Sequence, residues 1–186
     1  MRATAHRSLI PCSVPIRSAL LGMSTYVPLW TKSNYSFLEG ASHPAELVEQ
    51  AHAFGLPALA LTDRDGFYGA VRAHVRAREL GQRLIHGTQL SVGSSPEDAL
   101  PVVLLPTSRE GYATACQLVS AGRARCPKGT SVTELDELAC NTNDLLVLSP
   151  HASLLEPLRE AFADRAYALY ARHRRTAELG SEEALR

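Results

Sequence analysis

The sequence predicts an α/β domain in which parallel strands alternate with helices, arranged as an open doubly wound sheet or as a barrel. Two near-continuous apolar runs of strand length, "LPALALT" (56–62) and "DLLVLS" (144–149), are typical of strands buried on both faces. Segments with apolar residues at helical spacing stand between such runs. Glycines and helix-capping residues separate the two kinds of segment.

The composition is that of one globular domain. The chain has 186 residues, of which 45% are apolar and 20% are charged. Lys plus Arg and Asp plus Glu number 19 each, so any contact with DNA is expected to be local or indirect, and no membrane partner is expected. The four cysteines form no C-x-x-C pair. This pattern indicates free thiols and a cytoplasmic location.

The chain ends are predicted to lie outside the fold. Within residues 1–22, Pro11, Pro15 and Arg17 interrupt any export signal, so we expect a disordered extension or a true translation start at Met23. Residues 23–173 are predicted to fold. Residues 174–186 form a polar segment that is compatible with a helix.

The first elements follow from capping and spacing. Residues 26–29 are strand-like, and Ser42 is expected to cap a helix that has Pro44 in its first turn and ends at Gly55. A strand over 56–62 follows. The next helix, 67–80, is predicted to turn Val71 and Val75 inward and its arginines outward.

The second half is interpreted in the same way. "RLIHGTQLSV" (83–92) and "LPVVLLP" (100–106) predict two strands. Ser108 is expected to cap a helix to Val119, and Thr133 with Asp136 resembles a capping box. A strand at 144–149, a helix at 153–162 and a strand at 165–171 complete the pattern. In such folds, function collects in the loops after the carboxyl ends of the strands, which are residues 30–35, 63–66, 89–93, 106–108 and 149–151.

Several motifs in order resemble one known family. The run "YVPLWTKSNYSFLEGASHPAELVEQAHAFGLPALALTDRDG" and its continuation through "PVVLLPTSREGYATACQLVSAGR" resemble the N-terminal part of the PHP (polymerase and histidinol phosphatase) domain of bacterial DNA polymerase III alpha-type subunits. The "SNYSFLEGASHPAELVEQA" portion is most similar to the error-prone branch. The resemblance covers about 26–173 and implies an incomplete, distorted (β/α) barrel of PHP type, with 23–173 as its N-terminal part.

The resemblance also implies a metal centre whose ligands are missing here. Active family members hold up to three divalent metals for phosphoester hydrolysis. The family's ligand positions fall on Pro28, Trp30, Lys32, Arg64, Gln89 and Pro101, and only Asp63 is retained. None of the first four offers a lone pair for a cation. We therefore expect no cofactor, with the family's zinc, manganese or magnesium lost.

Alternatives remain open for individual residues. Asp63 is a surviving ligand or, as we favour, a carboxylate that stabilises the next turn or pairs with Arg64. Ser33 and Ser36 are interpreted as turn hydroxyls. Lys32 and Arg64 form a candidate anion-binding pair. The seven histidines show no ligand spacing. Arg72, Arg76, Arg78 and Arg83 are a DNA-binding stripe or, as we favour, a solvated helix face beside Glu79.

The leading functional hypothesis is a catalytically inactive PHP domain with a scaffolding role in DNA replication or damage-tolerant repair synthesis. Its expected partners are the remainder of a polymerase alpha subunit or a translesion-synthesis complex. One alternative is a residual metal-dependent phosphoesterase. Another is a truncated polymerase fragment without independent function, because the polymerase palm is absent from these 186 residues.

Overall fold

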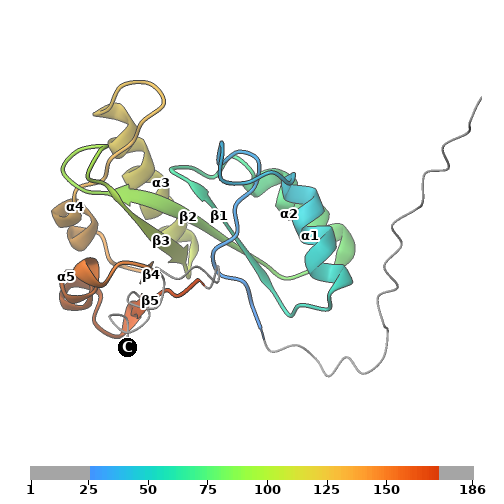
Figure 1. The fold of residues 1–186 in the computed structure, drawn as a ribbon. Helices are drawn as coiled ribbons and strands as arrows, with labels where there is room; N and C mark the ends of the chain where they lie inside the picture. Colours follow the sequence, from blue (N-terminus) through green and yellow to red (C-terminus); the bar gives the residue numbers. More distant parts are fainter. Residues whose placement is uncertain (1–25, 172–186) are drawn as a thin grey trace, which may run out of the picture.

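The computed structural model describes residues 26–171, in which helices and strands alternate along most of the chain (Figure 1). The expectations for 1–22 and 174–186 lie outside the described residues. The elements are α1 (Pro44–Ala53), β1 (Leu59–Arg64), α2 (Ala70–Leu80), β2 (Leu84–Val92), β3 (Leu100–Pro106), α3 (Arg109–Ala124), α4 (Leu135–Cys140), β4 (Leu145–Ser149), α5 (Ala152–Phe162), the short 3-10 helix η1 (Ala163–Arg165) and β5 (Ala166–Ala168).

One open sheet has the strand order β1-β2-β3-β4-β5. The predicted α/β class is confirmed, and β1 with β2 and β4 with β5 pair in parallel. The prediction of parallel strands is wrong for β3, which runs antiparallel to both neighbours. Residues 93–99, which join β2 to β3, contain no helix. A connection this short permits a hairpin, whereas a parallel crossover needs about a dozen residues or more.

The helices pack on one face of this sheet. Side chains alternate along each strand, so Leu59 and Leu61 face α1 and α2, while Ala60 between them faces the other side. Further along the same face, α3, α4 and α5 pack on the strands through a buried apolar cluster that includes Leu90, Leu104 and Phe162. The opposite face carries a smaller apolar cluster, to which Leu29, Trp30 and Leu169 add partly buried side chains.

The segment before α1 is extended without forming a regular strand. Thr31 makes an isolated parallel bridge to Leu61, and the Ala60 N–H donates to the Pro28 carbonyl at 3.0 Å. The predicted strand at 26–29 is therefore wrong, because Pro28 has no N–H with which to continue a ladder. The segment still lies along the edge of β1. It carries residues 30–33 toward the carboxyl end of that strand.

The N-cap residues of α1 and α4 differ from the sequence prediction. The N-cap of α1 is His43 rather than Ser42, because Glu46, three residues further on, accepts from the His43 N–H at 2.8 Å. Thr133 does not cap α4: it pairs with Val92 in a parallel bridge, and Glu134 is the N-cap. The Ser108 cap is confirmed, since its hydroxyl accepts from the Gly111 N–H at 3.1 Å.

The predicted inward face of α2 is also wrong. Ala70, Ala73 and Ala77 are buried, the last two against β1 and α1, whereas Val71 and Val75 are 74% and 53% exposed. The small side chains allow α1 and α2 to approach closely. Among the described residues, no helix combines the length and apolar character needed to cross a membrane.

Candidate functional site

Asp63, at the carboxyl end of β1, is the retained member of the family's ligand set, and its side chain is buried. Its Oδ1 accepts from the Ser33 N–H at 2.7 Å and from the Ser36 hydroxyl at 2.8 Å. The Ser33 hydroxyl lies 2.8 Å from Oδ2. The carboxylate therefore holds the turn that follows residue 32. The structural role predicted for Asp63, Ser33 and Ser36 matches these contacts, and Asp63 makes them with serines rather than with Arg64.

The turn over residues 33–40 folds around the Asp63 carboxylate. The Ser36 N–H donates to the Ser33 carbonyl, and the Gly40 N–H donates to the Ser36 carbonyl, both at 2.9 Å. A Cβ on Gly40 would lie 2.2 Å from the Ser33 carbonyl oxygen, so only glycine permits this close approach. Leu38, at the tip, has φ +64° and is 90% exposed.

Trp30 and Gln89 bond to each other across the site. The indole Nε1–H of Trp30 donates to Oε1 of Gln89 at 2.9 Å. In the family these positions carry a histidine and a glutamate that ligate metal. Here the indole offers a donor and no lone pair, and the amide oxygen that faces it is already used. Two former ligand positions are therefore joined by a direct hydrogen bond.

Lys32 and Arg64 meet on one carboxylate. The Lys32 ammonium pairs with Oε2 of Glu39, and Arg64 reaches Oε1 at 2.6 Å. Lys32 also lies 5.0 Å from the centre of the Trp30 ring, within the range of a cation–π contact. The structure thus brings the two predicted anion-binding cations together. The anion between them is the protein's own Glu39.

The two prolines at ligand positions contribute backbone only. The Pro28 carbonyl accepts from Ala60, as described above, and Pro101 stands opposite Ser91 in the pairing of β2 with β3. Neither side chain offers an atom to a cation.

The side chains present do not fit a divalent cation. Such a site needs several oxygen, nitrogen or sulfur ligands with lone pairs and compensating negative charge. Both Asp63 oxygens are occupied by serine donors, and two cations stand at neighbouring positions. Within residues 26–171, no group of three or more His, Cys, Asp or Glu side chains could hold a metal ion.

Sequence reasoning missed two acidic residues at this end of the sheet. Glu39 is the sole acidic residue in "TKSNYSFLEG", which also contains Lys32, but nothing in the sequence places the distant Arg64 beside it. Asp65 is also buried, and it accepts from the Ser91 N–H and hydroxyl at 2.9 Å each. Burial raises the pKa of Asp65 despite these bonds. No spacing signal in the sequence indicates the Asp65–Ser91 contact.

The predicted arginine stripe on α2 is ion-paired in part. Arg76 contacts Glu49 and Glu79, each at 2.7 Å. These exposed pairs fit the solvated helix face that we favoured. The described cysteines, Cys116, Cys126 and Cys140, are free thiols, as predicted.

Comparison with known proteins gives a consistent result. The profile of the PHP domain family matches residues 29–179. An error-prone DNA polymerase of Rhodopirellula baltica is 38% identical over 167 residues, and one of Anaeromyxobacter sp. (strain K) is 44% identical over 163. Each match covers 80% of this chain and 14% of the polymerase, so the chain spans about one seventh of the length of these relatives.

A solved structure shares the fold. A crystal structure of a candidate metal-dependent phosphoesterase from Bifidobacterium adolescentis superposes with a TM-score of 0.58 at 17% identity. The match covers 86% of this chain and 81% of the other.

Proposed function

This chain belongs to the PHP domain family, and from that premise we propose that it is a catalytically inactive member whose role is structural. It corresponds to the N-terminal region of error-prone DNA polymerases. Its folded surface supports a polymerase body or a partner in damage-tolerant DNA synthesis.

The main support for this proposal is that four side chains at the family's ligand positions bond to one another or to Glu39. Trp30 bonds to Gln89, and Lys32 and Arg64 share Glu39. Each of these four side chains is paired with another side chain, so these positions contribute to folding rather than offering open ligands. Binding a metal here would require breaking these contacts and placing a dication beside two cations.

Retention of the turn supports a role for the shape of the domain. Asp63, Ser33, Ser36 and Gly40 keep a specific buried geometry, although the neighbouring ligand positions have changed. An arrangement of this kind is expected where the scaffold is needed and the chemistry is not.

A hydrolysis assay with matched variants tests inactivity. The full chain is assayed with bis-p-nitrophenyl phosphate and p-nitrophenyl phosphate in the presence of Mn²⁺, Zn²⁺ or Mg²⁺. We expect background rates with every metal. The matched comparison is a variant that restores family-type ligands, Trp30→His with Lys32→His, Arg64→His and Gln89→Glu. Metal-dependent hydrolysis by the unaltered chain that Asp63→Ala abolishes would refute the proposal.

A binding assay tests the scaffolding role. The chain is co-expressed with the Anaeromyxobacter error-prone DNA polymerase from which the matching N-terminal segment has been deleted. We expect the two to co-purify and the polymerase to gain solubility. Failure of a well-folded chain to associate, together with unchanged polymerase solubility, would argue against this role.

A further inference from the structure

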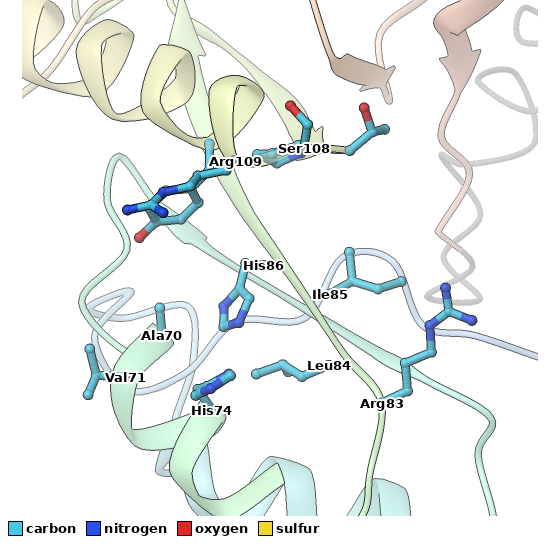
Figure 2. Close-up of a pocket in the computed structure, with 12 residues that line it drawn as sticks. Ala70, Val71, His74, Arg83, Leu84, Ile85, His86, Ser108 and Arg109 are labelled. Carbon is cyan, nitrogen blue, oxygen red and sulfur yellow. The ribbon is translucent and has the colours of Figure 1, made fainter. Parts of the chain in front are cut away.

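The helix layer of the sheet has a gap over the start of β2, at Leu84 and His86, whereas Leu90 and Val92 further along the strand are buried. Because β2 connects to β3 by a hairpin, no crossover helix covers the sheet between α2 and α3. A pocket of about 520 Å³ occupies this position (Figure 2). Its volume falls within the range of about 300–1,000 Å³ that is typical of small-molecule sites. It lies on the helix-covered face, whereas Trp30 belongs to the opposite face. The lining residues named below are His74, Arg83, Leu84, His86, Arg109 and Tyr112.

Aromatic rings surround the pocket. The ring centres of His74 and His86 are 5.5 Å apart, and those of His86 and Tyr112 are 6.5 Å apart. Figure 2 shows His74 on α2 close to His86, with Leu84 beside them and Arg109 at the start of α3 on the other side of the space. Planar groups with an apolar floor favour a flat ligand that can stack or meet ring edges.

Within the described part of the chain, His86 has an unpartnered polar atom behind this wall. Its Nδ1 is buried and has no hydrogen-bond partner within residues 26–171. Burial lowers the pKa of His86, and the neighbouring His74 adds to the effect, so the ring is neutral near pH 7. Buried polar atoms of proteins nearly always have partners. Because this nitrogen has almost no accessible surface, His86 contributes its neutral ring to the pocket rather than Nδ1.

The lining of the pocket contains basic residues and no acidic ones. None of the lining residues is Asp or Glu, and they include Arg83 and Arg109. Arg109 makes no ion pair with another described residue. Its guanidinium is suited to bind an oxyanion, because it presents several N–H donors in one plane.

We propose that this pocket binds a nucleoside monophosphate. The base lies against the rings of His74, His86 and Tyr112, and the phosphate pairs with Arg109. This ligand class combines a flat heteroaromatic ring, hydrogen-bonding edges and a negative charge. The inference is independent of the proposed scaffolding function, because it uses none of the residues at the former metal positions.

The test is a titration of the full chain followed by NMR of the histidine ring protons. AMP, GMP, CMP and dTMP are added separately, with adenosine, inorganic phosphate and Zn²⁺ as comparison arms. We expect saturable shifts of the His74 and His86 signals with at least one of the four nucleotides. Adenosine and phosphate should each bind at least about tenfold more weakly, a difference of about 1.4 kcal/mol.

Variants assign the site. Arg109→Ala should weaken nucleotide binding about tenfold and leave the adenosine response unchanged, while Arg72→Ala on the exposed side of α2 should change neither. A dispersed spectrum and an unchanged thermal midpoint show that each variant folds. The proposal is overturned if no nucleotide gives a saturable shift, if Zn²⁺ alone shifts both rings, or if Arg109→Ala binds nucleotide as tightly as the parent chain.

Discussion

Asp63 shows how one residue can keep its position in a family motif with a different role. Its carboxylate is buried and accepts from Ser33 and Ser36. Replacing it with alanine would leave buried donors unsatisfied, which costs about 1–3 kcal/mol for each group. We expect Asp63→Ala to lower the free energy of unfolding by about 3 kcal/mol in urea denaturation.

The control is Asp136→Ala, which alters an exposed carboxylate and should change the free energy of unfolding by less than about 0.5 kcal/mol. If the two variants are equally stable, Asp63 does not hold the turn.

His86 gives a pH dependence with a definite sign. Burial lowers its folded-state pKa below the ordinary value of 6.5, with His74 contributing. Below 6.5 the unfolded chain therefore binds more protons than the folded chain does. The contribution of neutral His86 is fully present above pH 6.5 and is lost as pH falls through the folded pKa.

We expect the free energy of unfolding to fall between pH 7.5 and pH 5 less steeply in His86→Asn than in the parent chain. His74→Asn is the comparison, since it removes only the neighbouring charge. Parallel pH profiles for the parent chain and His86→Asn would contradict this account. The interval is chosen to straddle the ordinary histidine pKa of about 6.5.

For α2, residue periodicity predicts that a helix forms but not which of its faces is buried. The sequence indicates the helix, because apolar and charged residues alternate at helical spacing over 67–80. It does not indicate which apolar stripe is buried, because both the alanines and the two valines recur at that spacing. The close approach of α1 selects the alanines.

A pair of leucine substitutions tests that choice. Ala73→Leu should overpack the contact and lower the free energy of unfolding by about 1–3 kcal/mol, because Ala73 is fully buried. Val75→Leu, on the exposed side, should change it by less than about 0.5 kcal/mol. Denaturation midpoints in the reverse order would show that the valines face the core.

The turn over residues 33–40 bears on the anion-binding hypothesis. Glu39 already pairs with Lys32 and Arg64, so free phosphate would have to displace it. We expect no phosphate binding by the parent chain in calorimetry. Glu39→Gln should bind phosphate, and adding Lys32→Ala to Glu39→Gln should abolish that binding. Equal phosphate responses in the single and double variants would exclude Lys32 from the site.

At the scale of the whole molecule, the alternation of strands and helices was predicted correctly, but the direction of β3 was not. Apolar runs locate strands, whereas strand direction depends on the connection. The loop at 93–99 is too short for a crossover, which is a signal that the sequence already carried.

For the site, too, the residue types could be predicted from the sequence, whereas the contacts between them could not. The missing ligands were visible position by position, because residue type alone decides whether a lone pair is available. Their mutual contacts were not. Trp30 and Gln89 are far apart in sequence and meet only through the pairing of β1 with β2 and the bridge from Thr31 to Leu61. The pocket at the start of β2 likewise depends on a tertiary feature, the hairpin that joins β2 to β3.

The metal content of the purified chain tests the central claim most directly. The full chain is incubated with Mn²⁺ and Zn²⁺, separated from free metal, and measured by inductively coupled plasma mass spectrometry. A domain whose ligand positions are closed by the Trp30–Gln89 and Lys32–Glu39–Arg64 contacts should retain no stoichiometric metal. Stoichiometric manganese or zinc that is lost in Asp63→Ala would contradict the account.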